Sequence, residues 1–133
     1  MNWMHSLKQR LSSRKQPPFP YFVAVDAREM DDEELAVMKR LLKDLPAPFQ
    51  SQLGALRVVG RCGCGACPTI FFQPPQAGDT EYDIATARGQ DHSGGLVGAA
   101  LLEKNGVLSQ LEIFSVDGHD PWSIPTAQSL VPY

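Results

Sequence analysis

Three cysteines carry the clearest chemical potential in this chain, and all lie within six positions, at Cys62, Cys64 and Cys67. They belong to the stretch GRCGCGACPTIFF, and no other cysteine occurs in the sequence. Cys64 and Cys67 have the C-x-x-C spacing that zinc ribbons and fingers use for half of a metal site. The glycines at positions 63 and 65 permit a turn tight enough for the thiolates to converge.

A tetrahedral zinc site of the Cys₃His kind needs a fourth ligand from outside this turn. His119, in the sequence DGHDP, is the expected ligand, and His92 or Asp117 could replace it. Zinc ribbons normally carry a second C-x-x-C pair, which this chain lacks. Zinc binding is therefore the alternative hypothesis for the turn and not the preferred one.

A thiol nucleophile is a second chemical interpretation of the same turn. It would need an activating base, and both His92 and His119 are expected on loops that could reach a cysteine. A thioredoxin-like C-x-x-C opens a helix, whereas PTIFF after Cys67 has the composition of a strand. The signatures of phosphate loops, zinc proteases and serine hydrolases do not occur either. The preferred interpretation is a structural turn, with no catalytic residue and no required cofactor.

Size and composition place the chain among ordinary globular proteins. Its 133 residues suit one domain, with 43% hydrophobic and 20% charged residues. An odd number of cysteines excludes a fully paired disulfide framework, which favours a reducing cytoplasm. No apolar run approaches the ~18–20 residues of a membrane span, and no secretory signal is expected at the N-terminus.

Charge is distributed unevenly along the chain. Residues 1–16 contain four basic and no acidic residues, whereas the other 117 contain 8 basic and 15 acidic ones, a balance of −7. Phosphate contacts need clustered Lys and Arg, so the acidic body argues against nucleic-acid binding. It is compatible with a basic protein partner.

The first half of the chain predicts helices. Residues 1–16 are expected to form a basic N-terminal helix or arm, separate from a single domain over residues 17–133. The clearest helix is DDEELAVMKRLLKDLP, where Asp31 and Glu34 form a capping box and Pro46 ends the pattern. Its expected apolar stripe consists of Leu35, Met38, Leu41, Leu42 and Leu45.

The second half predicts strands. ALRVVGRC, PTIFFQ and EYDIATARG have strand composition, and GLVGAALLEKNGVLSQLEIFSV predicts a β-hairpin whose turn is Asn105-Gly106. In that turn Lys104 should lie opposite Val107 and Leu102 opposite Ser109. The expected fold is α+β, with N-terminal helices packed on an antiparallel sheet of about four strands.

Two stretches together suggest a relationship. VVGRCGCGACPTIFF and GGLVGAALLEKNGVLSQLEIFSVDGHDPWSIP, within residues 58–125, resemble a group of small, uncharacterised bacterial proteins. That group has a CxCGC-like turn and a C-terminal strand of the form LExFSxDG. Its turn is one residue shorter, because Ala66 separates Gly65 from Cys67 in this chain. The resemblance implies no activity and no metal geometry.

These observations favour a cytoplasmic, non-enzymatic protein-interaction module. It would be a bacterial immunity or antitoxin-type protein that binds and occludes a partner, such as a basic toxin. The alternative is a small zinc-binding domain that uses the three cysteines and a histidine. The expected partner contacts are acids with one aromatic anchor: Glu103, Glu112, Asp117, Asp120 and Trp122.

Overall fold

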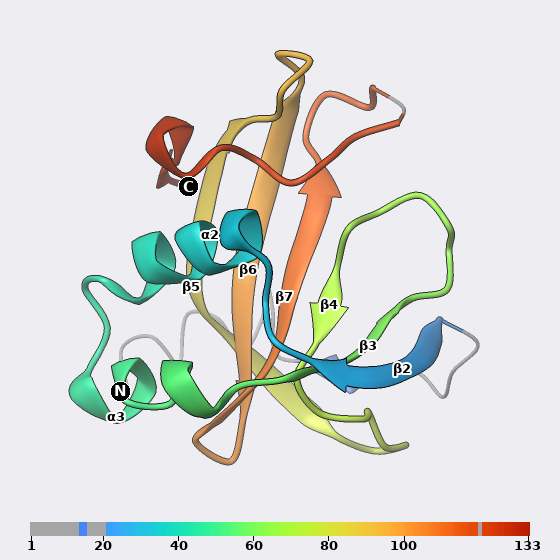
Figure 1. The fold of residues 1–133 in the computed structure, drawn as a ribbon, viewed down its shortest axis with the longest axis vertical. Coiled ribbons are helices and arrows are strands. Elements are labelled where there is room, and N and C mark those ends of the chain that lie inside the picture. The colour runs from blue at the N-terminus through green and yellow to red at the C-terminus, as the bar shows by residue number, and fades with distance from the viewer. Residues whose placement is uncertain (1–13, 16–20, 120) are drawn as a thin grey trace.

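An antiparallel sheet of eight strands dominates the computed structural model, which describes residues 14–15, 21–119 and 121–133 (Figure 1). The strands are β1 (Arg14–Lys15), β2 (Phe22–Arg28), β3 (Val58–Cys62), β4 (Ile70–Phe71), β5 (Thr80–Gln90), β6 (Leu96–Lys104), β7 (Val107–Ser115) and β8 (Val131–Pro132). Their order across the sheet is β1-β5-β6-β7-β4-β3-β2, and β8 also pairs with β5. The helices are α2 (Asp32–Leu42) and α3 (Ala47–Gln50), with 3₁₀ turns at Leu53–Ala55 and Ala127–Ser129.

The expected fold, helices packed on about four strands, is therefore wrong, and the chain is mostly β. The predicted strand segments ALRVVGRC, PTIFFQ and EYDIATARG correspond to β3, β4 and β5, and the predicted hairpin contains β6 and β7. Strands β1 and β8 add to these and have only two residues each, too few to show any period. The expected helix at residues 1–16 lies outside the described residues except for β1, which pairs with Thr80 and Glu81 of β5.

Helix α2 begins with the predicted capping box, which the structure confirms. The Asp31 carboxylate accepts a hydrogen bond from the Glu34 backbone N–H at 2.8 Å, and the Glu34 carboxylate accepts one from the Asp31 N–H at 2.9 Å. Arg28 at the end of β2 forms two further hydrogen bonds to Glu34, at 2.9 and 3.0 Å. The same glutamate therefore fixes both the start of α2 and its connection to the sheet.

The core lies between α2 and one face of the sheet, which the helix crosses over β5 and β6 (Figure 1). Met38 and Val37 on the helix, with Leu101 and Leu111 on the central strands, are fully buried. Leu35 and Leu45 of the expected stripe are only partly buried. Each fully buried aliphatic side chain contributes roughly 1.5–3 kcal/mol, so this layer stabilises the sheet on which the loops described below depend.

The β6–β7 hairpin has the predicted two-residue turn. Asn105 and Gly106 have φ angles of 53° and 83°, the positive values that a type I′ turn requires. Lys104 lies opposite Val107 as expected. The Glu103 carboxylate accepts a hydrogen bond from the Gly106 N–H at 2.7 Å, which closes the turn.

A bulge in this hairpin changes the register beyond the turn. Leu102 lies opposite Gln110, so the expected pairing of Leu102 with Ser109 is wrong. The extra residue brings the side chains of Ser109 and Gln110 together, and both donate hydrogen bonds to the carboxylate of Glu81 on β5. Glu81 is only 2% exposed, and these donors satisfy a polar group whose burial would otherwise be costly.

Candidate metal centre

The three cysteines lie on the loop that connects β3 to β4. Gly60 and Arg61 of β3 pair with Phe71 and Ile70 of β4, and the Cys62 N–H extends this ladder to the carbonyl of Thr69 at 3.3 Å. Residues 63–66 form the exposed tip of the loop. The cysteine loop is therefore held at its base by a strand pair and is open to solvent at its tip.

Thr69 attaches the base of this loop to β7. It is 5% exposed, and its hydroxyl accepts a hydrogen bond from the Ile113 N–H at 2.9 Å and donates one to the Ile113 carbonyl at 3.3 Å. The Cys67 thiol donates to the same hydroxyl at 3.5 Å. Because β4 begins only at Ile70, the Thr69 side chain takes the place of backbone pairing with β7 at this point in the sheet.

The sulfur atoms of Cys62, Cys64 and Cys67 converge. They lie within 4.8 Å of one another, and the Cys64 and Cys67 sulfurs are 3.3 Å apart. Sulfurs bound to one zinc ion at ~2.3 Å would lie about 4 Å apart, so small side-chain rotations suffice to bring them to one ion. Gly65, with a φ of 77°, provides the left-handed backbone conformation of the turn. Among the described residues, this is the group of three side chains whose positions suit a metal ion.

Backbone N–H groups point at two of these sulfurs. The Cys64 sulfur accepts hydrogen bonds from Ala66 at 3.4 Å and from Cys67 at 3.3 Å, and the Cys62 sulfur accepts one from Cys64 at 3.5 Å. Such donors stabilise a thiolate relative to a thiol. These hydrogen bonds therefore favour the thiolate of Cys64, the form that binds metals and electrophiles.

The thiols of Cys62 and Cys64 differ in acidity. Partial burial alone would raise the pKa of Cys64, but hydrogen bonds from the N–H groups of Ala66 and Cys67 and from the other two thiols lower it to about 7. For Cys62, burial dominates and raises the pKa to about 12. Cys64 is thus the thiol that ionises most readily of these two.

The expected fourth ligand, His119, lies elsewhere and does not join the cysteines. Its Nε2 is 3.0 Å from the Asp91 carboxylate, and its Nδ1 is 2.5 Å from the Asp117 carboxylate. The alternative ligand His92 pairs with Glu33 of α2 at 2.6 Å. In the described residues, the group whose geometry could hold a metal ion thus consists of three thiols without a histidine.

The Asp91–His119–Asp117 arrangement is a loop clamp that the sequence analysis did not predict. Asp91 follows β5, and its buried carboxylate also accepts hydrogen bonds from the N–H groups of Gly95 and Ser123. The hydrogen bond with His119 lowers the pKa of Asp91, while the Leu96 N–H and His119 lower that of Asp117 to about 2. Asp91 and Asp117 in turn raise the pKa of His119. The clamp ties the β5–β6 turn to the loop after β7.

The expected partner-binding residues do not form one patch. Glu103 is beside the hairpin turn, whereas Asp117 follows the other end of β7 and accepts a hydrogen bond from Leu96 at the far end of β6. Glu112 is half-buried on β7, and Trp122 is half-buried against the core. Asp120 lies outside the described residues. These residues therefore occur at both ends of the hairpin.

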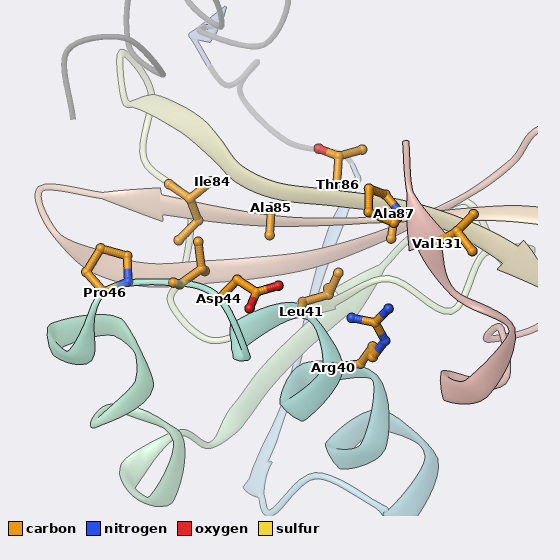
Figure 2. A pocket seen from close by; sticks show the side chains of 11 residues that line it. Arg40, Leu41, Asp44, Pro46, Ile84, Ala85, Thr86, Ala87 and Val131 are labelled. Atoms are coloured by element: carbon orange, nitrogen blue, oxygen red, sulfur yellow. The ribbon is translucent and has the colours of Figure 1, made fainter.

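A groove that the sequence analysis also missed lies between the end of α2, β5 and β8. Its volume is about 490 Å³, and its lining is mainly apolar. Figure 2 shows the side chains of Ile84, Ala85 and Ala87 directed toward the helix, while Thr86 points away from it. Arg40 at its rim donates a hydrogen bond to the Leu130 carbonyl at 3.3 Å. The lining of the groove contains neither cysteine nor histidine.

None of the described helices is both long and apolar enough to cross a lipid bilayer. No family model, no curated protein and no solved structure matches the chain.

Proposed function

We propose that this chain binds one thiophilic metal ion, with Zn²⁺ as the expected ion, through Cys62, Cys64 and Cys67. The observation that carries the proposal is the convergence of three sulfurs within 4.8 Å on a loop fixed at its base. Soft thiolate ligands select Zn²⁺, Cu⁺ and iron–sulfur clusters over hard cations such as Mg²⁺. Reduced thiols also require a reducing compartment, for which the cytoplasm is the natural candidate.

Backbone donors support this assignment. Metal binding requires thiolates, so protons must leave the cysteines when the ion binds. The N–H groups of Ala66 and Cys67 lower the cost of the thiolate at Cys64 before any ion arrives. Three thiolates around Zn²⁺ leave the fourth position of a tetrahedron for water or another exogenous ligand, as in zinc sites with three protein ligands.

A zinc titration of the reduced, untagged protein tests this function. We expect about one Zn²⁺ per chain, competed by a chelator, and a loss of binding in Cys64→Ser. His119→Ala is the matched control, because His119 is engaged with two carboxylates and lies outside the sulfur group. Equal zinc content in the wild type and the Cys64→Ser variant would remove the proposal. A loss of binding in His119→Ala as well as in Cys64→Ser would instead restore the Cys₃His site expected from the sequence.

Protein binding is the second candidate function, favoured by the apolar groove rather than by the acidic residues. Val131, which lines the groove, is 48% exposed. In this proposal the chain acts as an immunity-type protein, and its partner buries apolar side chains in the groove, with Arg40 and Asp44 at the rim. Apolar side chains at the centre of an interface carry most of its binding energy.

Co-purification from the native host tests the second candidate. Val131→Asp should abolish capture of a dominant partner, whereas Val107→Asp should not. Val107 is a matched control because it is 49% exposed and lies at the hairpin turn. Capture that is unaffected by Val131→Asp, or equally reduced by both variants, would reject the groove as the binding surface.

A further inference from the structure

The Cys64 and Cys67 sulfurs are positioned for direct bond formation. They are 3.3 Å apart, whereas a disulfide needs about 2.05 Å, so an approach of about 1.3 Å closes the bond. Both residues lie on the exposed loop, and neither is bonded to another cysteine. The tip between them has no regular secondary structure to break, since residues 63–69 follow the last residue of β3.

Access and activation favour the same residue as the attacking group. Cys64 is exposed, whereas Cys62 and Cys67 are partly buried. Two backbone N–H groups donate to the Cys64 sulfur, which favours its thiolate, the form that attacks disulfides. Cys67 is then the nearest thiol to resolve any adduct formed on Cys64.

We propose that Cys64 and Cys67 form a reversible dithiol–disulfide pair that reacts with low-molecular-weight disulfides and thereby controls the metal site. The release of the metal rests on the proposed metal-binding function, whereas the disulfide chemistry does not. Closing the bond removes two of three thiolate ligands and leaves Cys62 alone, and a single thiolate cannot form the three-ligand site. Oxidation therefore empties the site, and reduction restores it.

The reaction proceeds by two thiol–disulfide exchanges. The Cys64 thiolate attacks one sulfur of a disulfide such as oxidised glutathione, forms a mixed disulfide and expels one glutathione thiolate. The Cys67 thiol then loses its proton to solvent and attacks the Cys64 sulfur, which expels the second glutathione thiolate. Two electrons pass from the cysteine pair to glutathione disulfide, which becomes two molecules of glutathione.

Peptide mapping of the metal-free protein after treatment with oxidised glutathione tests the chemistry. The wild type and Cys62→Ser should both yield a Cys64–Cys67 bridge with the loss of two hydrogen masses. Cys67→Ser should instead accumulate a glutathione adduct on Cys64, because the resolving thiol is absent. Adducts without a bridge in the wild type, or a bridge that includes Cys62, would overturn the proposal.

The same treatment of zinc-loaded protein tests the link to the metal. A chromogenic chelator too weak to strip the reduced protein should report about one Zn²⁺ released per bridge formed, and a reductant should restore binding. If the bridge forms in a protein that never binds zinc, the metal function fails and the redox pair stands. If zinc binds and no bridge forms, or zinc remains bound after bridging, the proposed redox control fails while the metal function stands.

Discussion

Replacing Thr69 by valine tests how the cysteine loop is attached to the sheet. Valine has nearly the same shape but lacks the hydroxyl that accepts from the Ile113 N–H at 2.9 Å and donates to its carbonyl. Thr69 is 5% exposed and Ile113 is 1% exposed, so water cannot easily replace the lost partner. A buried donor left without a partner costs about 1–3 kcal/mol, which is the expected decrease in the free energy of unfolding.

Urea unfolding, followed by circular dichroism, measures this decrease. With a denaturant slope of about 1–3 kcal/mol/M, the midpoint should fall by about 1 M while the slope is unchanged. Thr80→Val is the matched control, because Thr80 is exposed on β5 and should change stability by less than about 0.5 kcal/mol. If Thr69→Val unfolds at the wild-type midpoint with the same slope, the Ile113 N–H has another partner and the proposed attachment is incorrect.

Three further perturbations test other parts of the structure. Asp31→Ala removes the N-cap of α2 and should lower the free energy of unfolding by about 1 kcal/mol in urea, and an unchanged midpoint would contradict the capping role. The pKa of His119 is raised, so its contribution to stability is complete below about pH 6.5 and is lost as the pH rises through the raised value. The pKa values of Asp91 and Asp117 are lowered, so their contributions are complete above about pH 4 and are lost as the pH falls. Urea midpoints should therefore peak between about pH 4 and 6.5 and decline less on the alkaline side in His119→Ala; identical pH profiles would contradict the clamp. Alkylation by iodoacetamide should modify Cys64 with a midpoint near pH 7 and leave Cys62 slow, and equal labelling rates would contradict the assigned acidities.

Elements governed by neighbouring residues were predictable. The capping box of α2 needs only Asp31 and Glu34, and the hairpin turn needs only Asn105 and Gly106, so both follow from short sequence patterns. The hairpin register was less predictable, because the bulge beside Leu102 depends on how the strand pair packs in the whole sheet. The two-residue strands β1 and β8 were not predicted, because each depends on hydrogen-bond partners that the longer strand β5 provides.

In the candidate site, too, the features set by nearby residues were predictable and those set by distant residues were not. The cysteine cluster was recognisable because its three members lie within six positions, and local spacing limits where their sulfurs can go. The position of His119 depends on a contact with Asp91, 28 residues earlier in the chain, which no local pattern reveals. The groove is even harder to predict from the sequence, because it joins residues of α2 to Val131, about 90 positions later. These features follow from strand order, which the sequence analysis did not predict.

X-ray absorption at the zinc edge of the reduced, zinc-loaded protein shows directly whether the three cysteines bind the ion. We expect three sulfur ligands at about 2.3 Å and one oxygen or nitrogen ligand at about 2.0–2.1 Å, with fewer sulfur ligands in Cys67→Ser. A zinc ion surrounded only by oxygen and nitrogen, or a reduced protein that takes up no zinc, would contradict a metal centre built from Cys62, Cys64 and Cys67.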